Sequence, residues 1–212
     1  MTTVEEINKR IQDEICFDTI LQLSDRMLME EYQNTKSVHR QVSLLKNVLD
    51  SHVQDTDVKT LIISEYMKNL IPAGTKGVIR GNKFNLIVKK RILEMGLDPE
   101  QYAVCFEKKC DAYVTDEIPD WYVMRKSDNR VLIGMNQLDL WGGGQQINRG
   151  SKYVINGEPE ENRKLLCVIC NPITIKTKNN KQYKLFDTGF RNDTLCYLNR
   201  LAPIIHAFFK SF

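Results

Sequence analysis

A change of hydrophobic period close to residue 96 constrains the fold of this chain more than any other feature. Before it, apolar residues recur every three or four positions, as in Ile7, Ile11 and Ile15, which predicts amphipathic helices. After it, runs such as YAVCFEK, WYVMRK and VLIGMNQLDL are short, rich in β-branched and aromatic residues, and bounded by turn-forming residues, which predicts strands. We therefore expect an α-rich front followed by an α/β core.

The front of the chain is predicted to form a helical subdomain over residues 1–72. Helical spacing recurs in a second run from Ile20 to Met27, in a third that starts at Ser37, and in a fourth with the sequence VKTLIISEYMKNLI. The stretch Ile71-Pro-Ala-Gly-Thr is typical of a helix end and marks a boundary. Residues 73–212 then form the core, whose first helix is expected from about Asn82 to Met95.

The rest of the core is predicted to alternate helices with buried strands. GGGQQINRGSKYV has helical spacing, and KLLCVICNPI reads as a buried strand. Ile173–Ile175 and Tyr183–Phe186 are expected to form an outer hairpin. The final stretch, DTLCYLNRLAPIIHAFFKSF, is expected to be one amphipathic helix that Pro203 bends. The predicted fold class is α/β (α+β), a mixed sheet flanked by helices.

Charge is distributed unevenly along the 212 residues. Residues 1–70 carry 8 Lys and Arg against 12 Asp and Glu, and residues 71–212 carry 22 against 15. A basic core suits a polyanion such as nucleic acid, although a modest basic excess is also common in proteins that bind none. No apolar run reaches the ~18–20 residues that span a bilayer, and the first residues are acidic and mixed. We expect no membrane partner and a cytoplasmic, intracellular location, in a host or viral setting.

Six cysteines include a CxxC pair, Cys167 and Cys170. The pair lies in the apolar run LLCVIC, and no second CxxC or histidine pair has the spacing of a zinc site. Reduced, buried cysteines are the favoured interpretation over a metal or redox motif.

Polar residues at two predicted strand ends form the strongest candidate site. Asp120 follows Pro119 at the mouth of a strand, while Gln137 and Asp139 share one face of the next strand. If these strands pair as a hairpin around SDNR, the three side chains meet. Carboxylate and amide oxygens suit magnesium, with Asp120 and Asp139 as its ligands. Taken singly, each carboxylate is also explained by a structural role, Asp120 at a turn and Asp139 as a helix cap.

Further polar residues are candidates for contacts with nucleic acid. Three glycines before a helix let the backbone approach an anion, but neither a Walker loop nor GxGxxG is present. On the helix after them, Lys152 is a candidate for stabilising charge on a phosphate, with Lys109 as an alternative. Glu107, at the end of the first predicted strand, is a candidate extra acidic ligand, although pairing with Lys108 and Lys109 explains it equally well. The candidate DNA-binding residues are Arg80, Asn82, Asn85, Gln145, Gln146, Asn148 and Arg149. A solvated polar helix is the alternative for the last four.

This pattern resembles the PD-(D/E)XK nuclease superfamily, and especially its type II restriction endonucleases. Pro119-Asp120 matches the first motif of the family. Where the family has acid-x-Lys, this chain has Gly134-Met135-Asn136 or Gln137-Leu138-Asp139, which leaves the catalytic base open. The resemblance implies a restriction-endonuclease-like fold. It also implies a homodimeric phosphodiesterase that hydrolyses double-stranded DNA with Mg²⁺, or with Mn²⁺ in its place.

Two other functions fit the same residues. A DNA-binding protein that keeps a nuclease fold without catalysis would explain the missing acid-x-Lys. A nuclease for branched or structured nucleic acid in viral or phage genome processing would use the same site on a different substrate.

Overall fold

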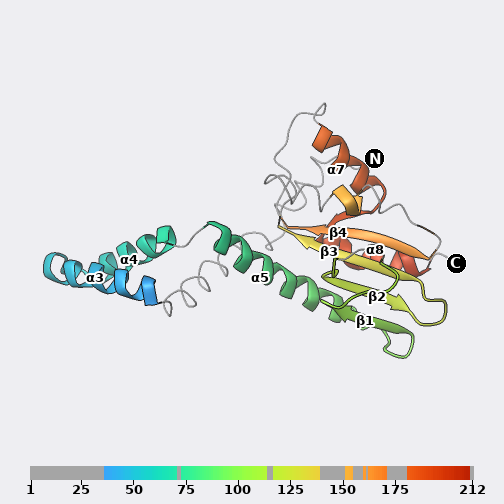
Figure 1. Ribbon diagram of the computed structural model, residues 1–212, viewed down its shortest axis with the longest axis horizontal. Helices are drawn as coiled ribbons and strands as arrows, with labels where there is room; N and C mark the ends of the chain where they lie inside the picture. The colour runs from blue at the N-terminus through green and yellow to red at the C-terminus, as the bar shows by residue number, and fades with distance from the viewer. Residues whose placement is uncertain are drawn as a thin grey trace. The chain divides into compact units, whose positions relative to one another are not determined.

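The structure is a computed structural model, and it describes residues 36–70, 73–113, 117–138, 151–154, 160, 162–170 and 181–210 (Figure 1). Contacts divide these residues into two units, one before Phe84 and one from Phe84 onward. The division falls inside a helix, eleven residues beyond the boundary at 72 that the sequence suggests. The helices expected within residues 1–35 lie outside the described part of the chain.

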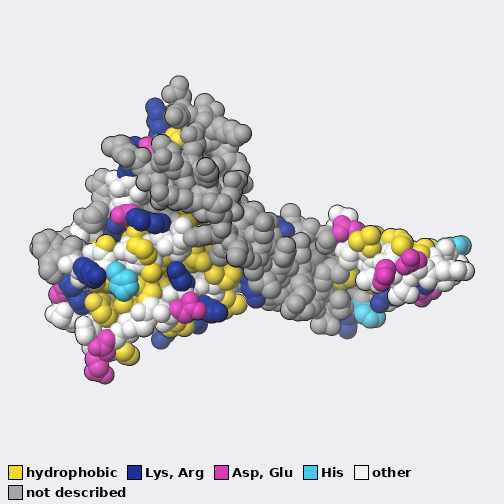
Figure 2. All heavy atoms as spheres, turned by 180° about the vertical axis from the view of Figure 1, so that it is seen from behind, with side chains coloured by type: hydrophobic (Ala, Val, Ile, Leu, Met, Phe, Trp, Pro, Cys, Tyr) yellow, Lys and Arg dark blue, Asp and Glu magenta, His cyan; other side chains and the backbone are white. Residues whose placement is uncertain are grey.

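Two helices in contact make up most of the first unit: α3 (Lys36–His52) and α4 (Thr56–Leu70), close to where the sequence predicts them. Asp55 caps α4, because its Oδ1 accepts the backbone N–H of Asp57 at 2.8 Å and that of Val58 at 3.1 Å. Val38, Leu49 and Met67 are buried. Figure 2 shows hydrophobic side chains on the surface of this pair. The exposed large apolar residues of the two helices are Leu44, Val48, Val58, Leu61, Ile62 and Tyr66.

Helix α5 (Ala73–Leu93) begins nine residues before the predicted start at Asn82. The sequence points to a later start because glycine costs about 1 kcal/mol relative to alanine inside a helix. Phe84, Val88 and Ile92 recur at four-residue spacing and are buried. The chain leaves the helix at Gly96, whose φ of +62° suits glycine.

A mixed sheet forms the centre of the second unit, as the sequence predicts, and the described residues supply five strands to it. Its strands lie side by side in chain order: β1 (Tyr102–Phe106), β2 (Trp121–Arg125), β3 (Val131–Gln137), β4 (Arg163–Ile169) and β5 (Leu195–Tyr197). The first three are antiparallel, whereas β3, β4 and β5 are parallel. The turn between β2 and β3 contains SDNR, so the predicted hairpin is confirmed.

Helical residues cover both faces of the sheet. On one face, called here the core face, α7 (Lys181–Arg191) and the helical residues 151–154 pack over alternate strand residues. These buried residues are Val131, Ile133, Met135, Leu165, Cys167, Ile169, Leu195 and Tyr197, packed with Tyr153, Val154 and Phe186. On the opposite face, Lys89 of α5 lies 5.1 Å from the centre of the Phe106 ring. Helix α8 (Leu198–Lys210) covers the same face, where Phe209 contacts Tyr102.

Two predictions near the C-terminus are wrong. Tyr183–Phe186 belongs to helix α7 rather than to a hairpin strand. Leu195–Tyr197 forms strand β5 rather than the start of the last helix. Tyr183, Phe186 and Phe190 follow a helical spacing that faces the sheet. The three residues of β5 are too few for a period to be recognised.

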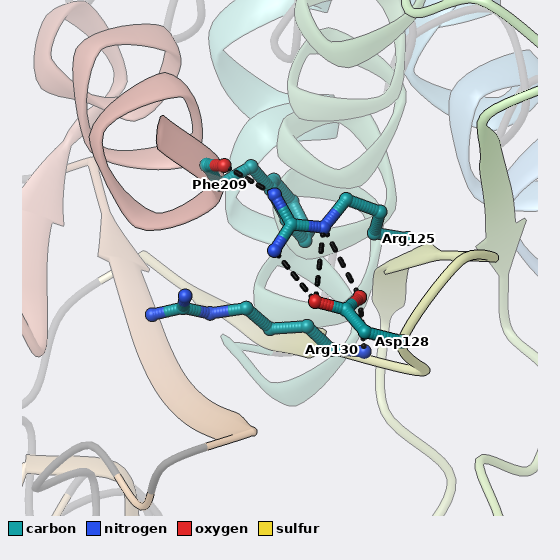
Figure 3. Close-up of polar contacts among 4 residues, drawn as sticks. All are labelled: Arg125, Asp128, Arg130 and Phe209. Carbon is teal, nitrogen blue, oxygen red and sulfur yellow. Dashed lines mark hydrogen bonds and ion pairs between the residues drawn. The ribbon is translucent and has the colours of Figure 1, made fainter. Parts of the chain in front are cut away.

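A cluster of arginines ties α8 to the turn between β2 and β3 (Figure 3). Arg125 binds Asp128 through Nε and Nη2, with Nη2 2.6 Å from Oδ2. Its Nη1 donates to the backbone oxygen of Phe209 at 2.5 Å. The guanidinium of Arg130 lies 4.4 Å from the centre of the Phe208 ring. The last turns of α8 are therefore held by β2 and by the turn after it.

The described cysteines match the prediction of reduced thiols. Cys105, Cys110, Cys167, Cys170 and Cys196 are free, and all but Cys105 are buried. Burial raises the pKa of the Cys167 and Cys196 thiols, so both stay protonated. Among the helices of the described ranges, none has the length and apolar character needed to cross a membrane.

Candidate functional site at the end of strand β3

Asp120 lies where β2 begins and β3 ends. Trp121 pairs with Gly134 across the two strands, so Asp120 stands beside the last residues of β3. Its Oδ2 accepts the backbone N–H of Asn136 at 2.6 Å. Its backbone oxygen accepts the N–H of Glu107, the residue after β1, at 3.0 Å. Three neighbouring strand ends therefore fix the position of this carboxylate.

The side chain of Asn136 joins Asp120 to the rest of the unit. Its Oδ1 accepts the indole N–H of Trp121 at 3.0 Å, and its Nδ2 donates to Oδ1 of Asn85 on α5 at 3.1 Å. Both Trp121 and Asn136 are buried. Because its side-chain amide is used in these bonds, Asn136 is poorly suited to the role of the family's catalytic lysine.

If Gly134-Met135-Asn136 is aligned with the acid-x-Lys motif of the resembled nucleases, Gly134 stands at the position of the acid. A Cβ atom at this position would lie 1.9 Å from Cε2 of Trp121. The indole thus lies directly against the backbone of β3. Any acidic partner of Asp120 must come from elsewhere in the chain.

Of Gln137 and Asp139, the structure describes only Gln137. Gln137 is half-buried at the end of β3, and its backbone oxygen accepts the N–H of Cys170 at 3.2 Å. By strand alternation with Val131, Ile133 and Met135, its side chain points to the core face. Asp139 lies outside the described residues, so its predicted meeting with Asp120 stays a prediction.

Lys152 and Glu117 bring a second carboxylate and a cation to this region. Lys152 Nζ lies 3.4 Å from Glu117 Oε1, and Glu117 stands three residues before Asp120 in the segment EIPD. Burial raises the pKa of the neighbouring Tyr153, as do a hydrogen bond with Tyr113 and the negative charges of Asp120 and Glu117. Asp120 and Glu117 thus both act electrostatically on the Tyr153 hydroxyl group. The sequence analysis missed Glu117, although its position in the Pro-Asp segment was a usable signal.

Glu107 has a left-handed backbone and an exposed side chain. Its φ is +51°, which lets the chain turn out of β1 while its N–H reaches Asp120. Its predicted role as a metal ligand stays a prediction. Within the described ranges, no group of three or more His, Cys, Asp or Glu residues is arranged to hold a metal ion. Asp120 still offers the hard carboxylate oxygen that Mg²⁺ prefers.

The candidate DNA-binding residues fall in different parts of the chain. Asn82 is exposed and Arg80 is half-buried, both on the part of α5 that belongs to the first unit. Asn85 belongs to the second unit, where it bonds to Asn136. Gln145, Gln146, Asn148 and Arg149 lie outside the described residues.

No family model matches this chain, and neither a curated protein nor a solved structure matches it.

Proposed function

We propose that this protein is a magnesium-dependent endonuclease that hydrolyses phosphodiester bonds in double-stranded DNA, at specific sequences and as a cytoplasmic homodimer. The observation that carries the proposal is the position of Asp120. Its carboxylate is fixed at the end of β3 by the amide of Asn136, in the same region as the Glu117–Lys152 ion pair. A carboxylate, a second acid and a lysine are the groups that the resembled nucleases use.

The arrangement of the strands gives further support. The Pro-Asp segment leads into β2, which pairs with β3 as a hairpin. Helical residues 151–154 lie between β3 and β4 along the chain, and these two strands pair in parallel. Helices cover both faces of this mixed sheet. This order is the one expected of a restriction-endonuclease-like core, in which the first motif and the second lie on neighbouring strands.

Each residue has a separate role in the proposed reaction. Asp120 and Asp139 would hold Mg²⁺, and the amide oxygen of Gln137 would be a further oxygen donor. When bound, the metal polarises the phosphate and lowers the pKa of a bound water. Lys152 stabilises the negative charge that develops on the phosphate oxygens. Water adds to phosphorus and the bond to the 3′ oxygen breaks, leaving a 5′-phosphate and, after proton uptake, a 3′-hydroxyl.

Replacing Asp120 by asparagine tests this proposal. Asp120→Asn keeps an oxygen that can accept the Asn136 N–H, so we expect the fold to persist. Loss of the charge should slow Mg²⁺-dependent plasmid cleavage by about a thousandfold, since metal catalysis contributes several kcal/mol. Asp111→Asn, at an exposed turn residue, is the matched control and should cleave normally. Equal cleavage by both variants would exclude Asp120 from the site.

A second candidate function is DNA binding without catalysis. It is favoured by the close contact between Trp121 and Gly134, which leaves no space for an acid at that position of the second motif. Electrophoresis of the protein with mixed-sequence DNA and Mg²⁺ or Mn²⁺ separates the two functions. A retarded band without fragments supports the binding protein, and discrete fragments support the endonuclease.

A further inference from the structure

Asn136 is an unexpected residue for a central strand. It is only 9% exposed, and asparagine is depleted in strands. A buried amide without hydrogen-bond partners costs free energy, because its hydrogen bonds to water are lost on burial. Asn136 avoids this cost because Trp121 donates to its Oδ1 and Asn85 accepts from its Nδ2. An apolar residue would need no such partners, so the amide is best explained by the geometry that it fixes.

That geometry is the position of Asp120. The backbone N–H of Asn136 holds the carboxylate, while its side chain holds the indole of Trp121, the next residue in the chain. Asn136 thus forms hydrogen bonds with two consecutive residues at the start of β2, Asp120 and Trp121. The remaining hydrogen bond, from Asn136 Nδ2 to Asn85 Oδ1, links Asn136 to α5, which is remote in the sequence. The orientation of Asp120 is connected to α5 through one residue.

We propose that Asn85 and Asn136 are positioning residues for Asp120. Asn85 fixes the side-chain amide of Asn136. This keeps the backbone N–H of Asn136 directed at the Asp120 carboxylate, which stays in its metal-binding orientation. This inference depends on the proposed function, in which Asp120 binds Mg²⁺. It gives Asn85 an interior role, distinct from the DNA contact expected from the sequence. Changing such an outer partner of a metal ligand typically lowers metal affinity about 10–100-fold.

The test compares variants of Asn85 that differ in the hydrogen-bond acceptor. Asn85→Leu and Asn85→Ala both remove the acceptor, one at similar volume and one without apolar bulk. Asn85→Asp keeps an acceptor for Asn136 Nδ2. The full-length protein, labelled with ¹⁵N, is titrated with MgCl₂ while the Asn136 amide and the Trp121 indole N–H are followed by NMR. DNA cleavage is measured over the same range of Mg²⁺ concentrations.

In the unchanged protein we expect the NMR signal of the Asn136 backbone N–H to shift as Mg²⁺ binds. Asn85→Leu and Asn85→Ala should raise the midpoint about 10–100-fold, with a matching shift in the Mg²⁺ dependence of cleavage. Asn85→Asp should stay close to the unchanged protein. Far-UV circular dichroism checks that each variant is folded, and either acceptor-free variant that folds is sufficient for the test.

Three results would overturn the positioning role. One is an unchanged Mg²⁺ midpoint in the acceptor-free variants, including the case in which only DNA affinity falls. Another is equal impairment with and without an acceptor. The third is an Asn136 amide that does not respond to Mg²⁺ in the unchanged protein. A protein that binds Mg²⁺ as described but cuts no DNA would refute the proposed function and leave the positioning role supported.

Discussion

The contact between Gly134 and Trp121 sets a strict size limit at one position of β3. In Gly134→Ala the new methyl carbon would lie 1.9 Å from Cε2 of the indole, so the ring or the strand must move. We expect a loss of about 1–3 kcal/mol in the free energy of unfolding, the usual cost of overpacking. Urea denaturation measures this loss.

Gly81→Ala is the matched control for that measurement. Gly81 lies within α5, and nothing stands within 4 Å of the Cβ position. The substitution should leave stability unchanged or increase it by up to about 1 kcal/mol. Equal stability of the two variants would show that the indole does not occupy the Gly134 position.

The pairing of Asp128 with Arg125 predicts a dependence of stability on acid. The hydrogen-bonded Arg125 guanidinium lowers the pKa of Asp128 from 3.8 to about 2. A lowered folded-state pKa means that the carboxylate stabilises the fold above about pH 4. This contribution is lost as pH falls from about 4 through 2. Asp128→Asn should therefore lose less stability than the unchanged protein between pH 5 and pH 2, as measured by thermal unfolding.

Asp111→Asn serves as the control for the acid measurement, because Asp111 is an exposed turn residue far from Arg125 in the sequence. It should retain the acid sensitivity of the unchanged protein. If Asp128→Asn retains it as well, the Arg125–Asp128 pair does not contribute to acid sensitivity.

At the scale of single residues, the sequence identifies Asp120 but not the residues that hold it. Asp120 stands out because it follows proline at a strand entrance. Asn136 does not, because its partners Asn85 and Trp121 are distant in the chain and become neighbours only through the packing of α5 on the sheet. Glu117 was missed because the ion pair with Lys152 joins segments 35 residues apart.

At the scale of elements, Arg125 makes the hydrogen bonds that join the end of α8 to β2 and to the turn after it. Arg125 supplies the hydrogen bond to the Phe209 carbonyl and the pairing with Asp128. Arg125→Lys keeps the charge but cannot make both contacts, because lysine lacks the planar fork of the guanidinium. We expect faster amide hydrogen exchange in residues 206–210, with the sheet strands unaffected.

Arg191→Lys provides the comparison for α8. Arg191 pairs with Asp187 within α7 and is half exposed, so its replacement should leave exchange in α8 unchanged. Exchange rates in α8 that are equal in the two variants would indicate that packing alone, rather than Arg125, holds this helix.

The elements with a clear period were predicted well, and those without one were not. Helices α3 and α4 are long enough for a helical period to show, and strands β1 to β4 are apolar, β-branched or aromatic runs long enough to be recognised. Strand β5 has three residues and is defined by pairing with β4, which local sequence does not encode. The early start of α5 goes against the intrinsic preferences of its glycines, which is why the sequence pointed to a later one.

At the scale of the whole molecule, the order of the elements determined the fold class. Antiparallel pairing of β2 and β3 follows from their short connection, whereas the longer segment after β3 allows a parallel return to β4. The sequence therefore predicted a mixed sheet with helices. The connection between Asp120 and α5 could not be predicted, because it depends on how a helix and a sheet pack.

The most direct test of the central claim is to incubate the purified protein with a fully sequenced plasmid, with Mg²⁺ or with EDTA, and to map every fragment end. We expect discrete fragments only with Mg²⁺, each with a 5′-phosphate and a 3′-hydroxyl. Intact plasmid under both conditions, or cleavage that persists in EDTA, would contradict a metal-dependent endonuclease built around Asp120.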